Sequence, residues 1–164
     1  MIRMFDLTSD HGYLNISMLD EAYMYQYWSE TPCNGGMYQD IVNMEYKNAI
    51  SNELYMLLVA SLHNRIPGDT VYLAKAKKSW EWFKKSSMIN SDKLVNDGLA
   101  ENNDGSCFNN KGPIWTYNQG VILGALTGIF PPTHFPRVCP LPGTPQLTLP
   151  PFRALVGYQR HKLP

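Results

Sequence analysis

The strongest structural signal in the sequence is an amphipathic helix over residues 46–64. Mostly apolar residues recur there at spacings of three and four, which places them on one broad face: Ile50, Leu54, Leu57, Leu58, Ser61 and Leu62. This face is expected to be buried. The helix is predicted to end at Arg65-Ile-Pro-Gly-Asp69, and Asp69 is placed to cap a second helix that runs to about Ser87.

The same kind of helix start occurs earlier in the chain. Asp10-His-Gly-Tyr-Leu14 is followed, at an offset of 59 residues, by the similar Asp69-Thr-Val-Tyr-Leu73. A cap and a Tyr-Leu pair repeated at this distance predict one helical hairpin used twice. Two unrelated capped helices would give a similar pattern and are the alternative.

A further helix is predicted over residues 117–130, where Pro131 and Pro132 end it. Its glycines, Gly120, Gly124 and Gly128, share one face and favour close backbone packing between helices. The stretch before it, residues 88–116, is rich in Asn, Asp and Gly. It is predicted to be a long ordered loop with short extended segments at 93–95 and 113–116.

Charge and proline content divide the chain in two. The 14 basic and 14 acidic residues balance, so the chain lacks the basic excess of proteins that bind nucleic acid. After residue 130, however, lie nine of the twelve prolines and no acidic residue. This composition predicts a helical domain over residues 1–130 and an irregular, disordered tail over 131–164.

Metal binding and membrane insertion are not expected. No pair of cysteines has the CxxC spacing and no pair of histidines the HxxxH spacing of metal sites. No apolar run reaches the 18 residues of a membrane span. The first residues also lack the apolar stretch of a signal peptide, so the chain taken literally is not exported.

Clusters of amide, carboxylate and aromatic residues suit sugar binding, because aromatic rings cover the apolar face of a pyranose while polar groups bind its hydroxyls. Three such clusters lie at or near predicted helix ends: Cys33-Asn-Gly-Gly-Met-Tyr-Gln-Asp40, Tyr46-Lys-Asn-Ala-Ile-Ser-Asn-Glu53 and Trp115-Thr-Tyr-Asn-Gln-Gly120. Their distribution favours a carbohydrate site at these ends.

The clusters are part of a longer series of strings: CNGGMYQDI, YKNAISNELYMLLVASLHNR, LVNDGL and WTYNQGVILGAL. In order and approximate spacing they resemble fungal and oomycete members of glycoside hydrolase family 76, over residues 2 to about 129. The resemblance implies an all-α fold, an incomplete (α/α)6 barrel of helical hairpins of the six-hairpin glycosidase type. It also implies cleavage of α-1,6-mannan with net retention and without a cofactor.

A retaining glycosidase needs two carboxyl groups about 5 Å apart, one as nucleophile and one as acid/base. Members of the family use two adjacent aspartates, and no such pair occurs in this chain. The resemblance implies that the pair lies upstream of Met1, so the chain alone is expected to be inactive. Asp20 and Glu21 are predicted to form a solvated helix face instead.

The resemblance places substrate-binding residues in the three clusters and in LVNDGL: Asn34, Gly35, Gly36, Tyr38, Lys47, Asn48, Asn52, Glu53, Asp97, Trp115, Tyr117, Asn118 and Gln119. For the four residues from Lys47 to Glu53, capping and hydrogen bonds between hairpins are the alternative. For Asp97 the alternative is a turn. Gly35 and Gly36 permit a tight turn with positive φ.

The aromatic residues Trp80, Trp82 and Phe83 are predicted to belong to the core rather than to the sugar site. Cys33 and Cys107 lie in matched loops, and the secretion that the resemblance implies would permit them to pair. Cys139, in the tail, is expected to stay free.

Two classes of function follow from the resemblance. The first is a fragment of a mannan hydrolase that binds α-mannan or manno-oligosaccharides and whose parent is extracellular or in the cell wall. The second is a non-catalytic mannan-binding or helical-repeat interaction protein. A gene-model artefact and a proline-rich ligand both explain the tail. Neither nucleic acid nor a membrane is an expected partner, and the sequence sets no oligomeric state.

Overall fold

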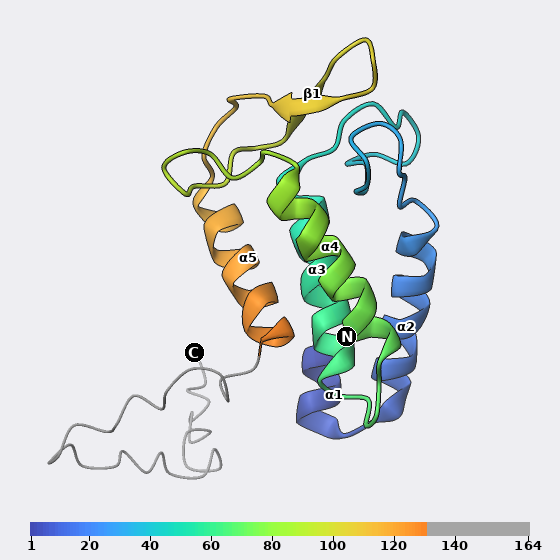
Figure 1. The fold of residues 1–164 in the computed structure, drawn as a ribbon. Coiled ribbons are helices and arrows are strands. Elements are labelled where there is room, and N and C mark those ends of the chain that lie inside the picture. Colours follow the sequence, from blue (N-terminus) through green and yellow to red (C-terminus); the bar gives the residue numbers. More distant parts are fainter. Residues whose placement is uncertain (131–164) are drawn as a thin grey trace, which may run out of the picture.

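The computed structural model describes residues 1–130, which form five helices and a two-stranded sheet (Figure 1). The elements in order are α1 (Ile2–Thr8), α2 (His11–Tyr25), α3 (Ala49–His63), α4 (Val71–Lys85), β1 (Leu99–Glu101), β2 (Cys107–Asn109) and α5 (Thr116–Ile129). The main predicted helices are confirmed to within a few residues. The predictions for residues 131–164, including a free Cys139, lie outside the described residues.

The longer helices form two successive helix–connection–helix units, α2–α3 and α4–α5, which we call hairpins although α4 packs mainly against α3 (Figure 1). Each hairpin begins at an aspartate that caps its first helix. Asp10 accepts a hydrogen bond from Gly12 N at 2.8 Å, and Asp69 accepts one from Val71 N at 3.0 Å. These bonds satisfy amides that have no partner within the helix. The repeat predicted from the sequence is therefore a repeated helical hairpin.

Helices α3 and α5 run in the same direction and pack closely through small residues. A methyl group added at Gly124 would stand 3.7 Å from Leu57, and one at Gly128 would stand 2.9 Å from Ala60 Cβ. Asn64 Nδ2 also donates to the Gly128 carbonyl at 2.8 Å. The predicted close packing is thus confirmed at Gly124 and Gly128, whereas Gly120 faces open space.

The hydrophobic core lies where α3 meets α4 and α5. Its largest members are fully buried, among them Tyr55 and Met56 from α3 and Phe83 from α4. Trp82 is buried in the same cluster and Trp80 packs against it. The prediction that these aromatic residues belong to the core is confirmed.

The strands do not lie where the sequence predicted them. Val95 forms only an isolated bridge with Ile89, and Thr116 begins α5. The sheet is instead a hairpin around residues 102–105, where Gly105 has φ +79° and its amide donates to the Asn102 carbonyl at 3.0 Å. The turn needs a residue that tolerates positive φ, and Gly105 provides it.

The prediction of a solvated Asp20-Glu21 face is wrong for Glu21, which is 2% exposed. Both of its carboxylate oxygens accept hydrogen bonds from Lys75 Nζ at 2.9 Å, and the Tyr55 hydroxyl donates to Oε1 at 2.7 Å. The three residues come from α4, α3 and α2. Because a lysine 54 positions away supplies the counter-charge, helical spacing alone could not reveal the pair.

Replacing Glu21 with alanine should lower the free energy of unfolding by about 3 kcal/mol, because it leaves a lysine and a buried hydroxyl without their partner. The matched control is Asp20→Ala, at the exposed neighbouring position, which should change that free energy by less than about 0.5 kcal/mol. Urea denaturation measures both. Equal effects at the two positions would contradict the assigned role of the buried network.

The glycines of α5 provide a second matched pair. Gly128→Ala should destabilise the protein, because the new methyl group meets Ala60 on the facing helix. Gly120→Ala should stabilise it by up to about 1 kcal/mol, because alanine has the higher helix propensity and nothing obstructs it. Thermal unfolding of the two variants should therefore shift in opposite directions, and shifts of the same sign would count against this packing.

Candidate functional site

Two long connections, residues 26–48 and 86–115, lie together at the end where α3 and α5 begin (Figure 1). We refer to these two segments as the loop end. Ala49 N donates to the Asp97 carbonyl at 2.7 Å and Leu99 N donates to the Lys47 carbonyl at 3.1 Å. A disulfide between Cys33 and Cys107 joins the connections covalently. The pairing that the resemblance permitted is therefore present.

Asp97 organises a group of side chains at the start of α5. Trp115 Nε1 donates to Asp97 Oδ1 at 2.8 Å, and the Tyr46 hydroxyl donates to Oδ2. Asn110 Nδ2 donates to the Tyr46 hydroxyl oxygen at 2.7 Å. Burial, together with the bond to Asp97, raises the pKa of Tyr46, so the phenol stays a proton donor. The backbone bends at Asp97, in part as the turn alternative expected, and the next residue, Gly98, bridges to Asn48.

Trp115 and Tyr117 form an exposed aromatic surface beside this group. Their rings are nearly parallel, with an interplanar angle of 10° and 5.8 Å between centroids. The two residues are 43% and 47% exposed. Large aromatic side chains so exposed and already oriented can cover the apolar face of a sugar ring.

The next two residues of the same cluster face inward. Gln119 Oε1 accepts from Val95 N and Gln119 Nε2 donates to the Val95 carbonyl, both at 2.9 Å. The Gln119 side chain thus pairs with the Val95 backbone as a neighbouring strand would, and so holds the loop against α5. Asn118 is 1% exposed, and neither of its side-chain polar atoms has a hydrogen-bond partner within residues 1–130.

Glu53 on α3 is a second buried polar residue of this kind. It is fully buried and neither carboxyl oxygen has a partner among the described residues. The contacts of Leu57 with Gly124 and of Ala60 with Gly128 set the register of the two helices, so Glu53 and Asn118 occupy neighbouring layers of the α3–α5 interface. Burial raises the pKa of Glu53 to about 8, so its carboxyl is protonated at neutral pH.

Lys47 is near the end of the first long connection, and its side chain lies beneath residues 29–35 of the same loop. Its ammonium donates to the carbonyls of Ser29, Pro32 and Gly35 at 2.7–2.8 Å, and it lies 4.9 Å from the ring centroid of Tyr38. The residue is 2% exposed, and burial lowers its pKa to about 8. Lys47 therefore fixes the conformation of the loop from inside.

The asparagines of α3 also act on this loop. Asn48 accepts from Ser51 N at 3.2 Å and so caps the helix. Asn52 exchanges two hydrogen bonds with the backbone of Met37, at 2.8 and 3.0 Å. These contacts match the capping and hairpin-bonding alternative considered for the cluster.

Gly35 and Gly36 have φ +139° and +93°, as the predicted tight turn requires. Side chains at either position would overlap the indole of Trp82, so their second role is to admit a core tryptophan. Asn34 is exposed and lines a pocket on the α4 side, together with Trp28, Lys78 and Trp82. It is not brought together with Asp97 and the aromatic pair.

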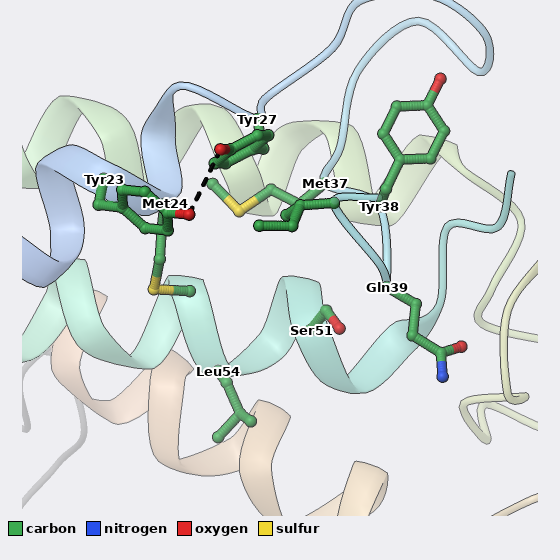
Figure 2. A pocket seen from close by; sticks show the side chains of 9 residues that line it. Tyr23, Met24, Tyr27, Met37, Tyr38, Gln39, Ser51 and Leu54 are labelled. Carbon is green, nitrogen blue, oxygen red and sulfur yellow. Dashed lines mark hydrogen bonds between the residues drawn. The ribbon is translucent and has the colours of Figure 1, made fainter. Parts of the chain in front are cut away.

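A pocket of about 230 Å³ lies between α2 and α3, under the loop that carries Tyr38 (Figure 2). It is lined by Tyr23, Met24, Tyr27, Met37, Tyr38, Gln39, Ile41, Ser51 and Leu54. The Tyr27 hydroxyl donates to the Tyr23 hydroxyl at 3.4 Å. Of the residues predicted for the site, Tyr38 alone lines it.

Sequence reasoning missed Tyr46 and Asn110 as members of the Asp97 group. Tyr46 stands in the second cluster, directly before Lys47, but its hydroxyl is recruited by residues 51 and 64 positions away. Asn110 lies in a polar loop without any distinguishing spacing. No local signal identifies either residue.

Within residues 1–130, no group of three or more His, Cys, Asp or Glu side chains could hold a metal ion. None of the helices described there is long and apolar enough to span a membrane.

The buried carboxyl predicts a pH dependence of stability. An unfolded glutamate ionises near pH 4.5, whereas folded Glu53 keeps its proton up to about pH 8. Between these values the folded chain binds more protons, so raising the pH should lower the free energy of unfolding, by up to about 1.4 kcal/mol per pH unit. Glu53→Gln, of nearly equal volume, should remove this part of the slope. Urea denaturation from pH 5 to 8 tests it, and parallel curves for the two proteins would refute it.

Comparison with solved structures identifies similar folds. An α-1,6-mannanase from a Salegentibacter species matches 78% of this chain with a TM-score of 0.68 and 29% identity, over 37% of its own length. Inactive variants of that enzyme, in which two consecutive aspartates are replaced, are known in complex with α-1,6-mannotriose and α-1,6-mannotetrose. A family 76 glycoside hydrolase from Bacteroides thetaiotaomicron, 22% identical, shares the fold with a TM-score of 0.71.

Curated proteins of similar sequence carry the name of the same kind of enzyme. Mannan endo-1,6-alpha-mannosidase DFG5 of Saccharomyces cerevisiae is 31% identical over 117 residues, 68% of this chain and 25% of that protein. DCW1 of Candida albicans, with the same enzyme name, is 29% identical over 109 residues. The chain spans about a quarter of the length of these relatives. The sequence profile of glycosyl hydrolase family 76 matches residues 3–135, and the chain therefore belongs to this family.

Proposed function

We propose that the chain is part of a retaining glycoside hydrolase that acts on α-1,6-linked mannan, and that its loop end forms one wall of the sugar-binding cleft. The observation that carries this proposal is the exposed Trp115–Tyr117 stack, whose tryptophan is held by Asp97. A relative that binds α-1,6-mannotriose shares the fold and 29% of the sequence.

The site residues divide into two groups in this proposal. Trp115 and Tyr117 contact the sugar ring, and Asp97, half-buried beside them, binds sugar hydroxyls. The remaining predicted residues position the loop end, because they are buried or bonded to its backbone: Gly35, Gly36, Lys47, Asn48, Asn52, Glu53, Asn118 and Gln119. Asn34 and Tyr38 lie apart from the aromatic pair and would contact only more distant sugar units.

The complete enzyme would be an (α/α)6 barrel in which α2–α3 and α4–α5 are two of the hairpins. In such an arrangement α3 and α5, which run in the same direction, belong to the inner ring. Their first turns then face the cleft, where the loop end lies. The repeated hairpin and the parallel packing of α3 with α5 support this assignment.

The chemical step requires a pair of carboxyl groups. The 164 residues contain no two consecutive aspartates, the pair whose replacement inactivates the Salegentibacter enzyme. We therefore expect the chain alone to bind mannan oligosaccharides without hydrolysing them. The disulfide supports an extracellular or cell-wall location for the parent protein.

A second candidate is a non-catalytic mannan-binding protein with the same aromatic surface. Transcripts that contain this coding sequence distinguish the two. Two consecutive in-frame aspartate codons ahead of the present Met1 codon support the hydrolase, and transcripts that lack them support the binding protein.

Calorimetric titration with α-1,6-mannotetraose tests the binding surface. Trp115→Ala and Tyr117→Ala should each weaken binding by about tenfold, equivalent to about 1.4 kcal/mol of lost stacking. Tyr23→Ala is the matched control, because Tyr23 is 53% exposed but lies on α2, outside the loop end; it should bind as the unaltered chain does. Circular dichroism verifies that each variant keeps its helices, and maltotetraose, which differs in both sugar and linkage, controls for non-specific sugar binding. Unchanged affinity in both Trp115→Ala and Tyr117→Ala would reject the proposed surface.

A further inference from the structure

One short motif plays no part in the proposed site. Asn15-Ile16-Ser17 is the single Asn-x-Ser/Thr triplet with a non-proline middle residue in the 164-residue sequence. This triplet is the acceptor for N-linked glycosylation in proteins that enter a eukaryotic secretory pathway. A motif this short also occurs by chance, so its placement in the fold must decide whether a sugar chain could be carried there.

The fold leaves Asn15 accessible. It lies on the second turn of α2, whose buried face consists of Leu14, Ser17 and Glu21. Asn15 itself is exposed, and its carboxamide makes no hydrogen bond to any of residues 1–130. Ser17, in contrast, is 1% exposed and donates to the Tyr13 carbonyl at 3.1 Å. The residue that would bear the sugar therefore faces solvent, whereas the serine of the triplet is buried.

The redox chemistry of the chain favours the required compartment. The Cys33–Cys107 disulfide joins two loops, and such structural disulfides form where the environment is oxidising, as in the endoplasmic reticulum. The curated relatives reported above are yeast proteins, so members of the family occur in cells that have a eukaryotic secretory pathway.

We propose that Asn15 is an N-glycosylation site. The Asn15 amide nitrogen bonds to C1 of the first N-acetylglucosamine of a lipid-linked oligosaccharide. The bond from C1 to the pyrophosphate oxygen breaks, the lipid pyrophosphate leaves, and the amide loses one proton. The inference rests on the triplet, the exposure and the disulfide, and it does not depend on the proposed mannanase function.

The sugar chain has a physical use at this position. Leu19, one turn further along the same face as Asn15, is 70% exposed, and Tyr23 after it is 53% exposed. A branched, hydrated oligosaccharide over this strip would shield it from association with other proteins. The site lies on the side of α3 opposite to α5, so the glycan would leave the aromatic pair open (Figure 1).

Expression of the chain behind a secretion signal in yeast tests the proposal. Protein recovered from medium and membranes should run as a heavier species that peptide N-glycosidase F converts to the polypeptide mass. Endoglycosidase H should leave one N-acetylglucosamine on the peptide containing Asn15, located by tandem mass spectrometry. Asn15→Gln and Ser17→Ala should each abolish the shift. Asn103→Gln, an exposed asparagine outside any acceptor triplet, should retain it.

The sugar is added before α2 folds, so a poorly stable chain does not obscure the result. Non-reducing mass analysis of the Cys33–Cys107 bond shows that the recovered chain has passed through the oxidising compartment. A disulfide-bonded chain with the bare polypeptide mass would overturn the proposal. A shift that persists in Asn15→Gln would overturn it as well. Neither outcome would affect the binding measured for Trp115 and Tyr117.

Discussion

The short pairing between residues 47–49 and 97–99 is the contact on which the loop end depends. It joins the start of α3 to the second long connection through the amides of Ala49 and Leu99. Gly98 makes the pairing possible, since any side chain there would overlap the Tyr46 hydroxyl and approach the Lys47 carbonyl. Once the segments are paired, Tyr46 meets Asp97, and Asp97 in turn holds Trp115. The orientation of an exposed tryptophan thus depends on a backbone contact between segments about fifty residues apart.

The interface between α3 and α5 changes in character along its length. Far from the loops, Ala60 meets Gly128 and the backbones approach closely. Nearer the loops, the interface contains Glu53 and Asn118, buried polar groups that each cost folding free energy when unpaired. The small residues therefore permit tight packing at the end of the interface far from the loops. This packing offsets the folding free energy that the buried polar groups cost near the loops. Proteins commonly accept such a loss of stability near a functional site.

The helices could be predicted from the sequence, because caps and apolar spacing are local features, as at Asp10 and Asp69. The loops could not. Asn-Asp-Gly occurs twice, at 96–98 and at 103–105. The second copy forms the turn of the β-hairpin, with Gly105 at positive φ, whereas the first bends at Asp97 and pairs with residues 47–49. Identical triplets thus take different conformations according to their distant partners, and the same holds for Glu21, whose counter-charge comes from α4.

Lys47 gives the loop a property that metal-stabilised loops lack. Three carbonyl oxygens surround its ammonium at 2.7–2.8 Å, an arrangement in which carbonyl groups replace the hydration shell of a cation. Here the cation is covalently part of the chain. It cannot dissociate, be chelated or be exchanged for another ion, and its local concentration is independent of the medium. The shape of this loop should therefore be insensitive to the salt and divalent ions of the surrounding medium.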